Sequence, residues 1–115
     1  MFDMEGERLV AQLRRGVLEY CVLAMLTEGQ RYGFDLVRTL GGMDGMVISE
    51  GTLYPLLSRL RREGNVKSEW HESEAGPPRK YYSLTEEGRD ARGRFNVEWT
   101  RVRDAVATVL SRASE

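Results

Sequence analysis

The side chains in this sequence that are best suited to binding a ligand are basic, and they gather in one stretch. Arginine and lysine bind phosphate oxygens, and arginine can also take both acceptors on a guanine edge. The net charge of the chain is −1. This counts against binding to a phosphate-rich partner, because domains that do so are often basic overall. The acids are spread more widely, so we expect a local basic patch with weak long-range attraction. The patch consists of Arg59, Arg61, Arg62, Lys67, Arg79 and Lys80.

Residues for catalysis or metal binding are scarce. His71 is the only histidine, which excludes a His-based metal cluster or catalytic triad, and there is no glycine-rich phosphate loop. Cys21 is the only cysteine, so it cannot form an internal disulfide. Its place in an apolar run predicts a buried, inert thiol, with a redox sensor as the alternative. We expect a protein that is not an enzyme and that has no metal site and no cofactor.

The composition is that of one folded domain. Hydrophobic residues make up 41% and charged residues 30% of the 115 residues, which argues against disorder. The longest nearly apolar run, residues 17–26, contains Glu19 and is too short to span a bilayer. It also lacks the flanks of a signal peptide. We therefore expect a cytoplasmic protein with no membrane partner.

Apolar periodicity predicts two helices in the first part of the chain. The first covers residues 7–27, with apolar positions spaced by three and four. From Val17 onward it is apolar on nearly every side, so it needs cover on two sides, and we expect a second subunit to supply one of them. The second helix covers residues 32–40, begins after Gly29 and ends at Gly41. Residues 43–48 then connect it to the next helix.

A third helix and a basic hairpin follow. Ser49 can cap this helix, and its leucines at 53, 56, 57 and 60 form one apolar stripe before Gly64 ends it. Pro55 requires either that the helix begin near Thr52 or that the backbone bend. Residues 66–72 alternate, with Val66, Ser68 and Trp70 on one side, and a Gly-Pro-Pro turn leads to a return strand.

The last helix covers residues 86–112 after a Thr85 cap. Its apolar positions alternate between steps of four and three, which is typical of a helix packed lengthwise against another helix. We expect dimerisation through this seam, with folding back onto the chain's own first helix as the alternative. The predicted dimer interface contains Val17, Tyr20, Phe95, Trp99, Val102, Val106 and Val109.

The predicted fold class is mainly α with a small β-hairpin. A short helix followed at once by a basic hairpin is the arrangement of a winged helix-turn-helix, in which the helix enters the major groove and the hairpin lies against the adjacent backbone. We assign residues 1–84 to this DNA-binding region and residues 85–115 to a C-terminal dimerisation helix, within one compact domain.

The predicted DNA contacts lie on the third helix, the hairpin and the start of the second helix. Hydroxyls and arginines can reach phosphates or base edges, and proline can meet a thymine methyl. The free N–H groups at the start of the second helix favour a phosphate, although an ordinary helix start is an equal alternative. For the third helix, the alternative is that its exposed side is only a solvated face of a structural helix and contacts no DNA. The residues are Tyr32, Gly33, Ser49, Glu50, Thr52, Tyr54, Pro55, Ser58, Arg59, Arg62, Lys67, Arg79 and Lys80.

Two residues could bind a small molecule. Trp99 lies on the predicted dimer seam, where it is either core or one of two indoles that stack on a flat ligand. Glu19 lies in the most apolar run, where it either faces solvent or lines a dimer cavity and meets a cationic ligand.

The chain resembles the PadR family of bacterial transcriptional regulators, in its short form with a single C-terminal helix. The resemblance is carried by Tyr32-Gly33, by the Gly51–Leu57 segment with Arg59-Leu60 and Glu63-Gly64, and by Arg79-Lys80-Tyr81-Tyr82 before Leu84-Thr85-Glu86-Glu87-Gly88. It implies a homodimeric winged helix-turn-helix repressor on a palindromic double-stranded DNA operator. It also implies that the last helix crosses to the first helix of the partner subunit.

The resemblance extends to the multidrug-responsive members of that family. Trp99 stands where their tryptophan stacks drugs, but Arg103 stands where the best-known example has an acidic residue. The residues around Trp99 are therefore as compatible with an uncharged or anionic aromatic ligand as with a cationic one. We expect a repressor that a small aromatic ligand relieves. The alternatives are a constitutive repressor without a ligand and a winged helix that binds a protein.

Overall fold

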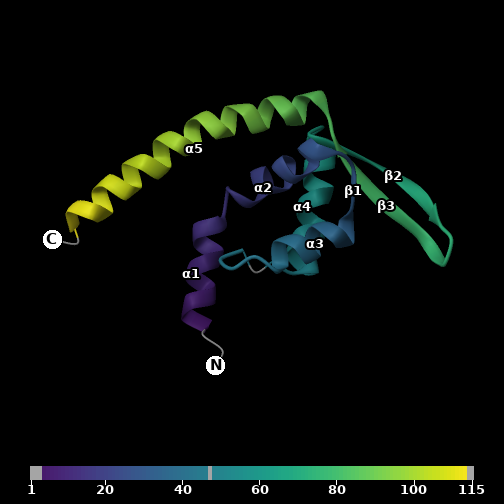
Figure 1. Ribbon diagram of the computed structural model, residues 1–115, viewed down its shortest axis with the longest axis horizontal. Coiled ribbons are helices and arrows are strands. Elements are labelled where there is room, and N and C mark those ends of the chain that lie inside the picture. Colours follow the sequence, from purple (N-terminus) through teal and green to yellow (C-terminus); the bar gives the residue numbers. More distant parts are fainter. Residues whose placement is uncertain (1–3, 47, 114–115) are drawn as a thin grey trace.

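The protein is a small helical body from which a hairpin and a long helix project (Figure 1). The computed structural model describes residues 4–46 and 48–113. The prediction of a mainly α fold with a small hairpin is confirmed. In chain order the elements are α1 (Met4–Arg14), α2 (Leu18–Met25), the 3₁₀ helix η1 (Leu26–Glu28), β1 (Arg31–Tyr32), α3 (Gly33–Gly41), α4 (Glu50–Arg62), β2 (Val66–Ser73), β3 (Gly76–Leu84) and α5 (Glu86–Ala113).

The core lies where α2, α3 and α4 meet the base of the sheet. Each helix buries the leucines that its spacing places on one side. Fully buried side chains come from every one of these elements: Val22, Leu23, Leu26, Leu36, Leu40, Leu53, Leu57, Leu60 and Val66. The leucine stripe predicted for the third helix is confirmed, with Leu56 as its half-buried margin.

The predicted continuous helix over residues 7–27 is wrong, because the chain breaks between α1 and α2. Gly16 adopts a φ of +83°, a left-handed conformation that glycine reaches without the steric cost of a side chain. α1 then leaves the body and buries none of its residues, while α2 buries Leu18, Val22 and Leu23. The apolar period runs through Gly16 unchanged, so periodicity alone did not reveal the break.

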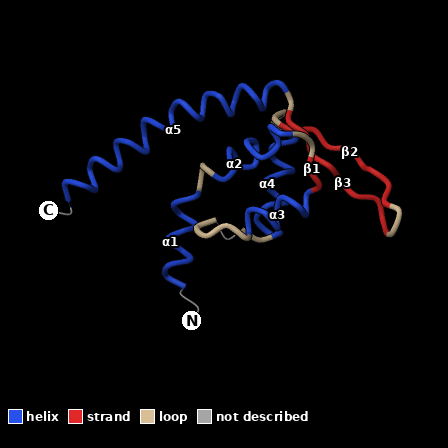
Figure 2. The backbone as a smooth tube through the Cα atoms, viewed as in Figure 1, coloured by secondary structure: helices blue, strands red, loops and turns tan. Residues whose placement is uncertain are grey.

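The sheet has three antiparallel strands in the order β1-β3-β2. The two-residue strand β1 was not predicted, because two residues are too few to show alternation. The predicted alternation of β2 holds at Val66, which is buried opposite Leu84. Trp70 also lies on the predicted side, since its partner Lys80 contacts both the Trp70 and the Tyr82 rings. It is nevertheless 66% exposed, and the hairpin extends past the helical body (Figure 2).

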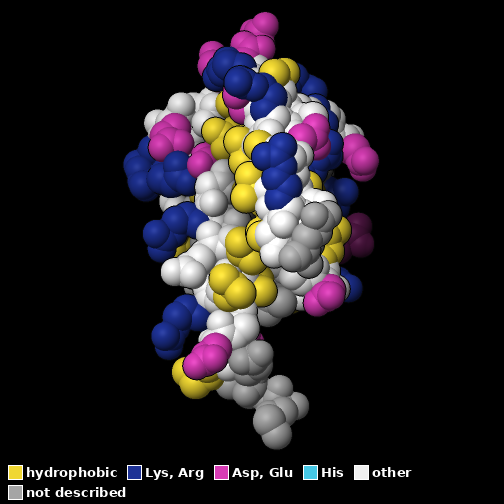
Figure 3. Space-filling view, turned by 90° about the vertical axis from the view of Figure 1, so that its left-hand side faces the viewer, with side chains coloured by type: hydrophobic (Ala, Val, Ile, Leu, Met, Phe, Trp, Pro, Cys, Tyr) yellow, Lys and Arg dark blue, Asp and Glu magenta, His cyan; other side chains and the backbone are white. Residues whose placement is uncertain are grey.

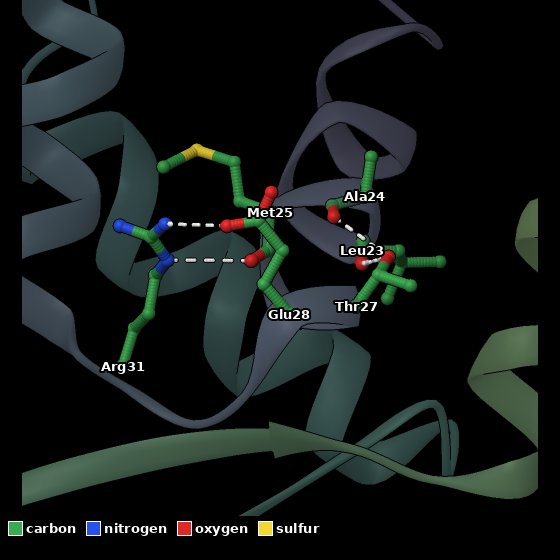
Figure 4. A network of polar contacts seen from close by, with 6 residues as sticks. All are labelled: Leu23, Ala24, Met25, Thr27, Glu28 and Arg31. Carbon is green, nitrogen blue, oxygen red and sulfur yellow. Dashed lines mark hydrogen bonds and ion pairs between the residues drawn. The ribbon is translucent and has the colours of Figure 1, made fainter.

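A small polar network fixes the turn from α2 into β1 (Figure 4). The Thr27 hydroxyl donates to the carbonyl of Ala24 at 2.7 Å, at the end of α2. Arg31 Nε donates to the carbonyl of Met25 at 3.3 Å, and its guanidinium pairs with Glu28 at 3.7 Å. These contacts hold β1 and the start of α3 against the end of α2.

α4 begins at Glu50 with Ser49 in the N-cap position. Pro55 therefore lies inside the helix, and the alternative in which the helix begins near Thr52 is wrong. The prediction that the Ser49 side chain caps the helix is wrong: it makes no cap hydrogen bond, and its hydroxyl instead hydrogen-bonds the hydroxyl of Thr52 at 3.3 Å. Gly64, at a φ of +83°, reverses the chain after the helix as predicted.

The joint between the body and α5 is tightly packed. Thr85 caps α5 as predicted, since its hydroxyl accepts from the Gly88 N–H at 3.0 Å and donates to the carbonyl of Gly64 at 2.6 Å. A Cβ at Gly88 would collide with the carbonyl oxygen of Asn65 and lie 2.7 Å from Leu84 Cδ1. The absence of a side chain at Gly88 thus lets α5 leave the body against the turn that follows α4.

Beyond this joint, α5 touches the body over its first turns only. Tyr20 of α2 stacks on Phe95 with the ring centroids 4.2 Å apart, and Phe95 stacks in turn on Trp99 at 6.0 Å. The rest of the helix projects from the body (Figure 1). The radius of gyration is 16.4 Å, against about 13 Å for a compact domain of this length. α5 therefore has a long surface that the body does not cover.

Two glycine-to-alanine changes on α5 should move stability in opposite directions. Gly88→Ala should lower the free energy of unfolding by about 2 kcal/mol or more, because the joint must open to admit a methyl group. Gly93→Ala meets nothing within 4 Å and should raise it by about 0.5–1 kcal/mol through helix propensity. Urea unfolding of both variants measures the difference. A neutral effect of Gly88→Ala would contradict the packing at this joint.

Candidate nucleic-acid interface

The leucine stripe decides which side of α4 faces outward. Because Leu53, Leu57 and Leu60 are buried, the residues half a turn away must lie on the opposite side of the helix. Four of the predicted contacts, Glu50, Pro55, Ser58 and Arg62, are exposed there or at its edges. They form a surface of one proline, one hydroxyl, one carboxylate and one guanidinium, which offers both apolar and hydrogen-bonding contacts to a DNA groove.

Tyr54 joins α4 to the start of α3. A Cβ at Gly33 would lie 3.1 Å from Tyr54 Cε1 and 3.3 Å from Tyr82 Cε2, so both rings pack directly on this glycine. Gly33 is thus buried under two tyrosines, which is a packing role that sequence reasoning missed. The only signal for it was a glycine at the start of an otherwise apolar helix. The structure brings Tyr32, Gly33 and Tyr54 together as neighbours.

The Tyr54 hydroxyl remains a hydrogen-bond donor at neutral pH. Burial raises the pKa of this phenol, and the carboxylate of Glu50 raises it further, followed by the nearby Tyr32 and Tyr82. A protonated phenol at the front of α4 can donate to a phosphate oxygen. The side chain is also half-buried, so its position is fixed before any ligand arrives.

The hairpin formed by β2 and β3, which we call the wing, carries aromatic and basic side chains on both faces. On one face, the guanidinium of Arg79 lies 5.0 Å from the centre of the Tyr32 ring, and Tyr32 lies against Tyr81 at 5.8 Å. His71 stacks on Tyr81 at 4.4 Å. This stack of rings was not predicted, because it depends on the pairing of β1 with β3. It fixes Arg79 beside the start of α3.

The other basic side chains of the predicted patch do not lie on the same face of the wing as Arg79. Lys80 lies on the opposite face of the wing, with Nζ 5.6 Å from the Trp70 ring and 5.9 Å from the Tyr82 ring. Lys67 is exposed near the base of the wing, where it pairs in register with Ser83. Arg61 lies on the wing side of α4, since its charge opposes the burial that raises the pKa of Tyr82.

Arg59 is held by two carboxylates. It donates to both oxygens of Glu63 at 3.1 Å and pairs with Glu19 of α2 at 3.6 Å. The side chain lies on the edge of the outward side of α4 that faces α2, next to Pro55 and Arg62 at spacings of four and three residues. Ion pairs of this exposure contribute only about 0–1 kcal/mol, so a phosphate can compete with them. Thr52 lies on the same edge, beside Ser49.

The structure does not group the three predicted ligand-binding residues within one chain. Trp99 continues the stack that starts with Tyr20 and Phe95. Arg103, one turn later, pairs with Asp104 at 3.1 Å. Glu19 lies on another side of α2, against Arg59. The predicted dimer residues Val102, Val106 and Val109 follow Trp99 along α5 and are exposed, whereas Val17 is half-buried at the start of α2.

Other kinds of site find little support in the part of the chain that the structure describes. There, no group of three or more histidine, cysteine and acidic side chains is placed to hold a metal ion. Burial raises the pKa of the Cys21 thiol, which disfavours the reactive thiolate. Within residues 4–46 and 48–113, no helix has the length and apolar character needed to cross a membrane.

The helices α3 and α4 with the basic wing define a winged helix-turn-helix, a DNA-binding class. Residues 22–94 match the model of the transcriptional regulator PadR-like family, and the chain belongs to this family. Its function is therefore DNA-binding regulation of transcription, and the expectation that it is not an enzyme is confirmed by this membership.

Solved structures of such regulators are similar over nearly the whole chain. A PadR family regulator from Eggerthella lenta is 38% identical, with a TM-score of 0.80 and 90% of each chain covered. A PadR-like regulator from Bacillus cereus is 34% identical, with a TM-score of 0.77 over 86% of this chain and 96% of that one. A Streptococcus transcriptional regulator is 40% identical, with a TM-score of 0.73 over 85% and 96%.

Tyr54→Phe should weaken DNA binding without unfolding the protein. The change keeps the ring that packs on Gly33 and removes only the hydroxyl, which should cost about 1–3 kcal/mol of binding if it contacts a phosphate. Fluorescence anisotropy with labelled DNA measures the affinity. Tyr20→Phe removes the same hydroxyl from a ring that stacks on Phe95 instead; because the stacked ring is kept, dimerisation and DNA affinity should both be unchanged. Equal affinities for both variants would remove Tyr54 from the interface.

Proposed function

We propose that the protein is a homodimeric repressor that binds a palindromic operator and is released by a small aromatic ligand bound at the dimer interface. The exposed apolar row on α5 carries this proposal. Trp99 is 38% exposed, and Val106 and Val109 are 50% and 62% exposed in the isolated chain. In a stable soluble protein, a continuous row of this kind on a projecting helix marks an interaction surface.

The spacing of the row supports a second helix as its partner. From Ala91 through Phe95, Trp99, Val102, Val106 and Val109, the steps are four, four, three, four and three residues, which keeps one stripe of the helix facing one neighbour. Figure 3 shows hydrophobic side chains gathered in a band on the face of the molecule toward which α5 projects.

α1 offers the complementary surface. Leu13 is 70% exposed and Leu9 is also exposed, on a helix that buries none of its residues. A two-fold dimer in which each α5 packs on the α1 of its partner covers both apolar surfaces at once. It also explains why α1 separates from the body at Gly16. Such a dimer presents two α4 helices, which can enter successive major grooves about 34 Å apart on one face of the DNA.

Trp99 and Arg103 are the residues we propose for the ligand. The Trp99 ring ends an aromatic stack, and the two-fold axis of the proposed dimer would bring a second indole near it, which suits a flat ring between them. Arg103 would favour an uncharged or anionic aromatic compound over a cation. Glu19 takes no part in this version of the site, because it is paired with Arg59.

The first experiment is anisotropy of the purified protein on its own upstream DNA and on scrambled DNA, at moderate salt. Tight binding to the upstream fragment alone is the expected result. Binding should also weaken steeply with salt, since phosphate contacts release counterions. Equal and weak binding to both fragments would favour a winged helix that serves a protein partner, which the net charge of −1 also allows.

Val106→Asp should convert the protein to a monomer and abolish tight operator binding. A carboxylate in the apolar row cannot be buried without a partner. The matched control is Val97→Asp, which lies on the opposite side of the same helix and is also exposed. Light scattering and anisotropy should find the control dimeric and DNA-bound. A dimeric Val106→Asp variant would contradict the proposed interface.

Trp99→Ala should abolish release by aromatic compounds. Candidate compounds are screened on the operator complex, and the response of the variant is compared with that of the original chain at equal occupancy of the DNA. If Trp99→Ala instead dissociates the dimer, the indole is part of the dimer core. If no aromatic compound releases the original chain, the repressor is constitutive.

A further inference from the structure

Trp70 is the large aromatic side chain of the wing that the proposed contacts leave unused. It is 66% exposed, on a strand that pairs with β3 along its length. An indole exposed on a projecting hairpin adds little to the fold beyond its contact with the Lys80 ammonium at 5.6 Å, because hydrophobic stabilisation requires burial. Its exposed surface is available to a partner outside the chain.

The Trp70 face of the wing is continuous with α4. Lys80 lies between the rings of Trp70 and Tyr82, 5.6 Å and 5.9 Å away. Tyr82 packs on Gly33 beside Tyr54, and the charge of Arg61 reaches it from α4. The buried Tyr82 thus joins the base of this face to α4, and Lys80 and Trp70 continue the face along the wing. A ligand in contact with α4 and long enough to follow the wing would reach Trp70.

We propose that Trp70 packs against the deoxyribose–phosphate edge of the minor groove that flanks the major groove read by α4, with Lys80 on an adjacent phosphate. This inference rests on the proposed DNA-binding surface and extends it to a residue outside the predicted contacts. Trp70 contributes affinity that does not depend on base sequence, because sugars and phosphates carry no direct sequence information.

The charges of the wing favour this location over the floor of the groove. Lys80 supplies the cation on the Trp70 face, whereas Glu69 lies on the other face and pairs with His71 at 3.2 Å. Glu72 and Glu74 lie toward the tip, where carboxylates oppose deep entry between two phosphate backbones. An apolar side chain set back from an acidic tip fits the rim, where it covers the carbon atoms of a sugar.

The first test separates affinity from specificity. Trp70→Ala should lower the affinity for the operator and for scrambled DNA by the same factor, on the order of ten, and leave the ratio of the two unchanged. The dependence of log affinity on log salt should keep its slope, since no charge is removed. Lys80→Ala should reduce that slope by about one unit for each wing that touches DNA.

The second test reads the indole directly. DNA is added to the original chain and to Trp70→Phe, in which Trp99 is the remaining tryptophan. The original chain should show an emission change that Trp70→Phe lacks, while anisotropy finds that Trp70→Phe still binds DNA, since a phenyl ring preserves most of the apolar contact. Circular dichroism checks that both Trp70 variants are folded.

The outcomes distinguish this inference from the proposed function. If the original chain binds its operator but Trp70→Ala binds equally well, or if Trp70→Phe retains the full emission change, the inference is wrong and the DNA-binding function stands. If Trp70→Ala changes the ratio of operator to scrambled DNA, Trp70 reads bases and the backbone assignment is wrong. If the original chain binds no DNA, the proposed operator binding itself fails.

Discussion

The burial of one side of α4 is the interaction on which the rest of this structure depends. Leu53, Leu57 and Leu60 are fully buried, and each contributes about 1.5–3 kcal/mol relative to an exposed side chain. Rotating the helix to hide its polar side would forfeit all three. The outward position of Pro55, Ser58 and Arg62 is therefore a consequence of core packing, and the surface that we propose for DNA contact is held by the same energy that holds the fold.

The fixed position of α4 also determines where the wing begins and in which direction α5 leaves the body. Gly64 reverses the chain at the end of α4, and the turn that it starts meets both Thr85 and Gly88. The direction of α5 is thus fixed against the C-terminal end of α4. In the dimer that we propose, a change at the C-terminal helices would alter the separation of the two α4 helices, because no flexible linker lies between α4, the wing and α5.

The positive charges that can attract DNA are few, and they are held in position by neighbouring side chains. The chain carries a net charge of −1, so attraction to DNA must come from a few basic side chains held in position. Arg79 is held over Tyr32, Lys80 between Trp70 and Tyr82, and Arg59 between Glu19 and Glu63. Each of these cations loses less side-chain freedom on binding than an unrestrained one would.

The sequence by itself determined the elements with strong local signals. The leucine period of α4, the Thr85 cap and the basic residues after Gly-Pro-Pro were sufficient to predict the fold class and the side of α4 that faces outward. The tertiary structure alone decided the break at Gly16, the strand β1, the packing of two tyrosines on Gly33, the carboxylates around Arg59 and the exposure of Trp70. These features depend on residues distant in sequence, and local periodicity carries no information about which distant side chains become neighbours.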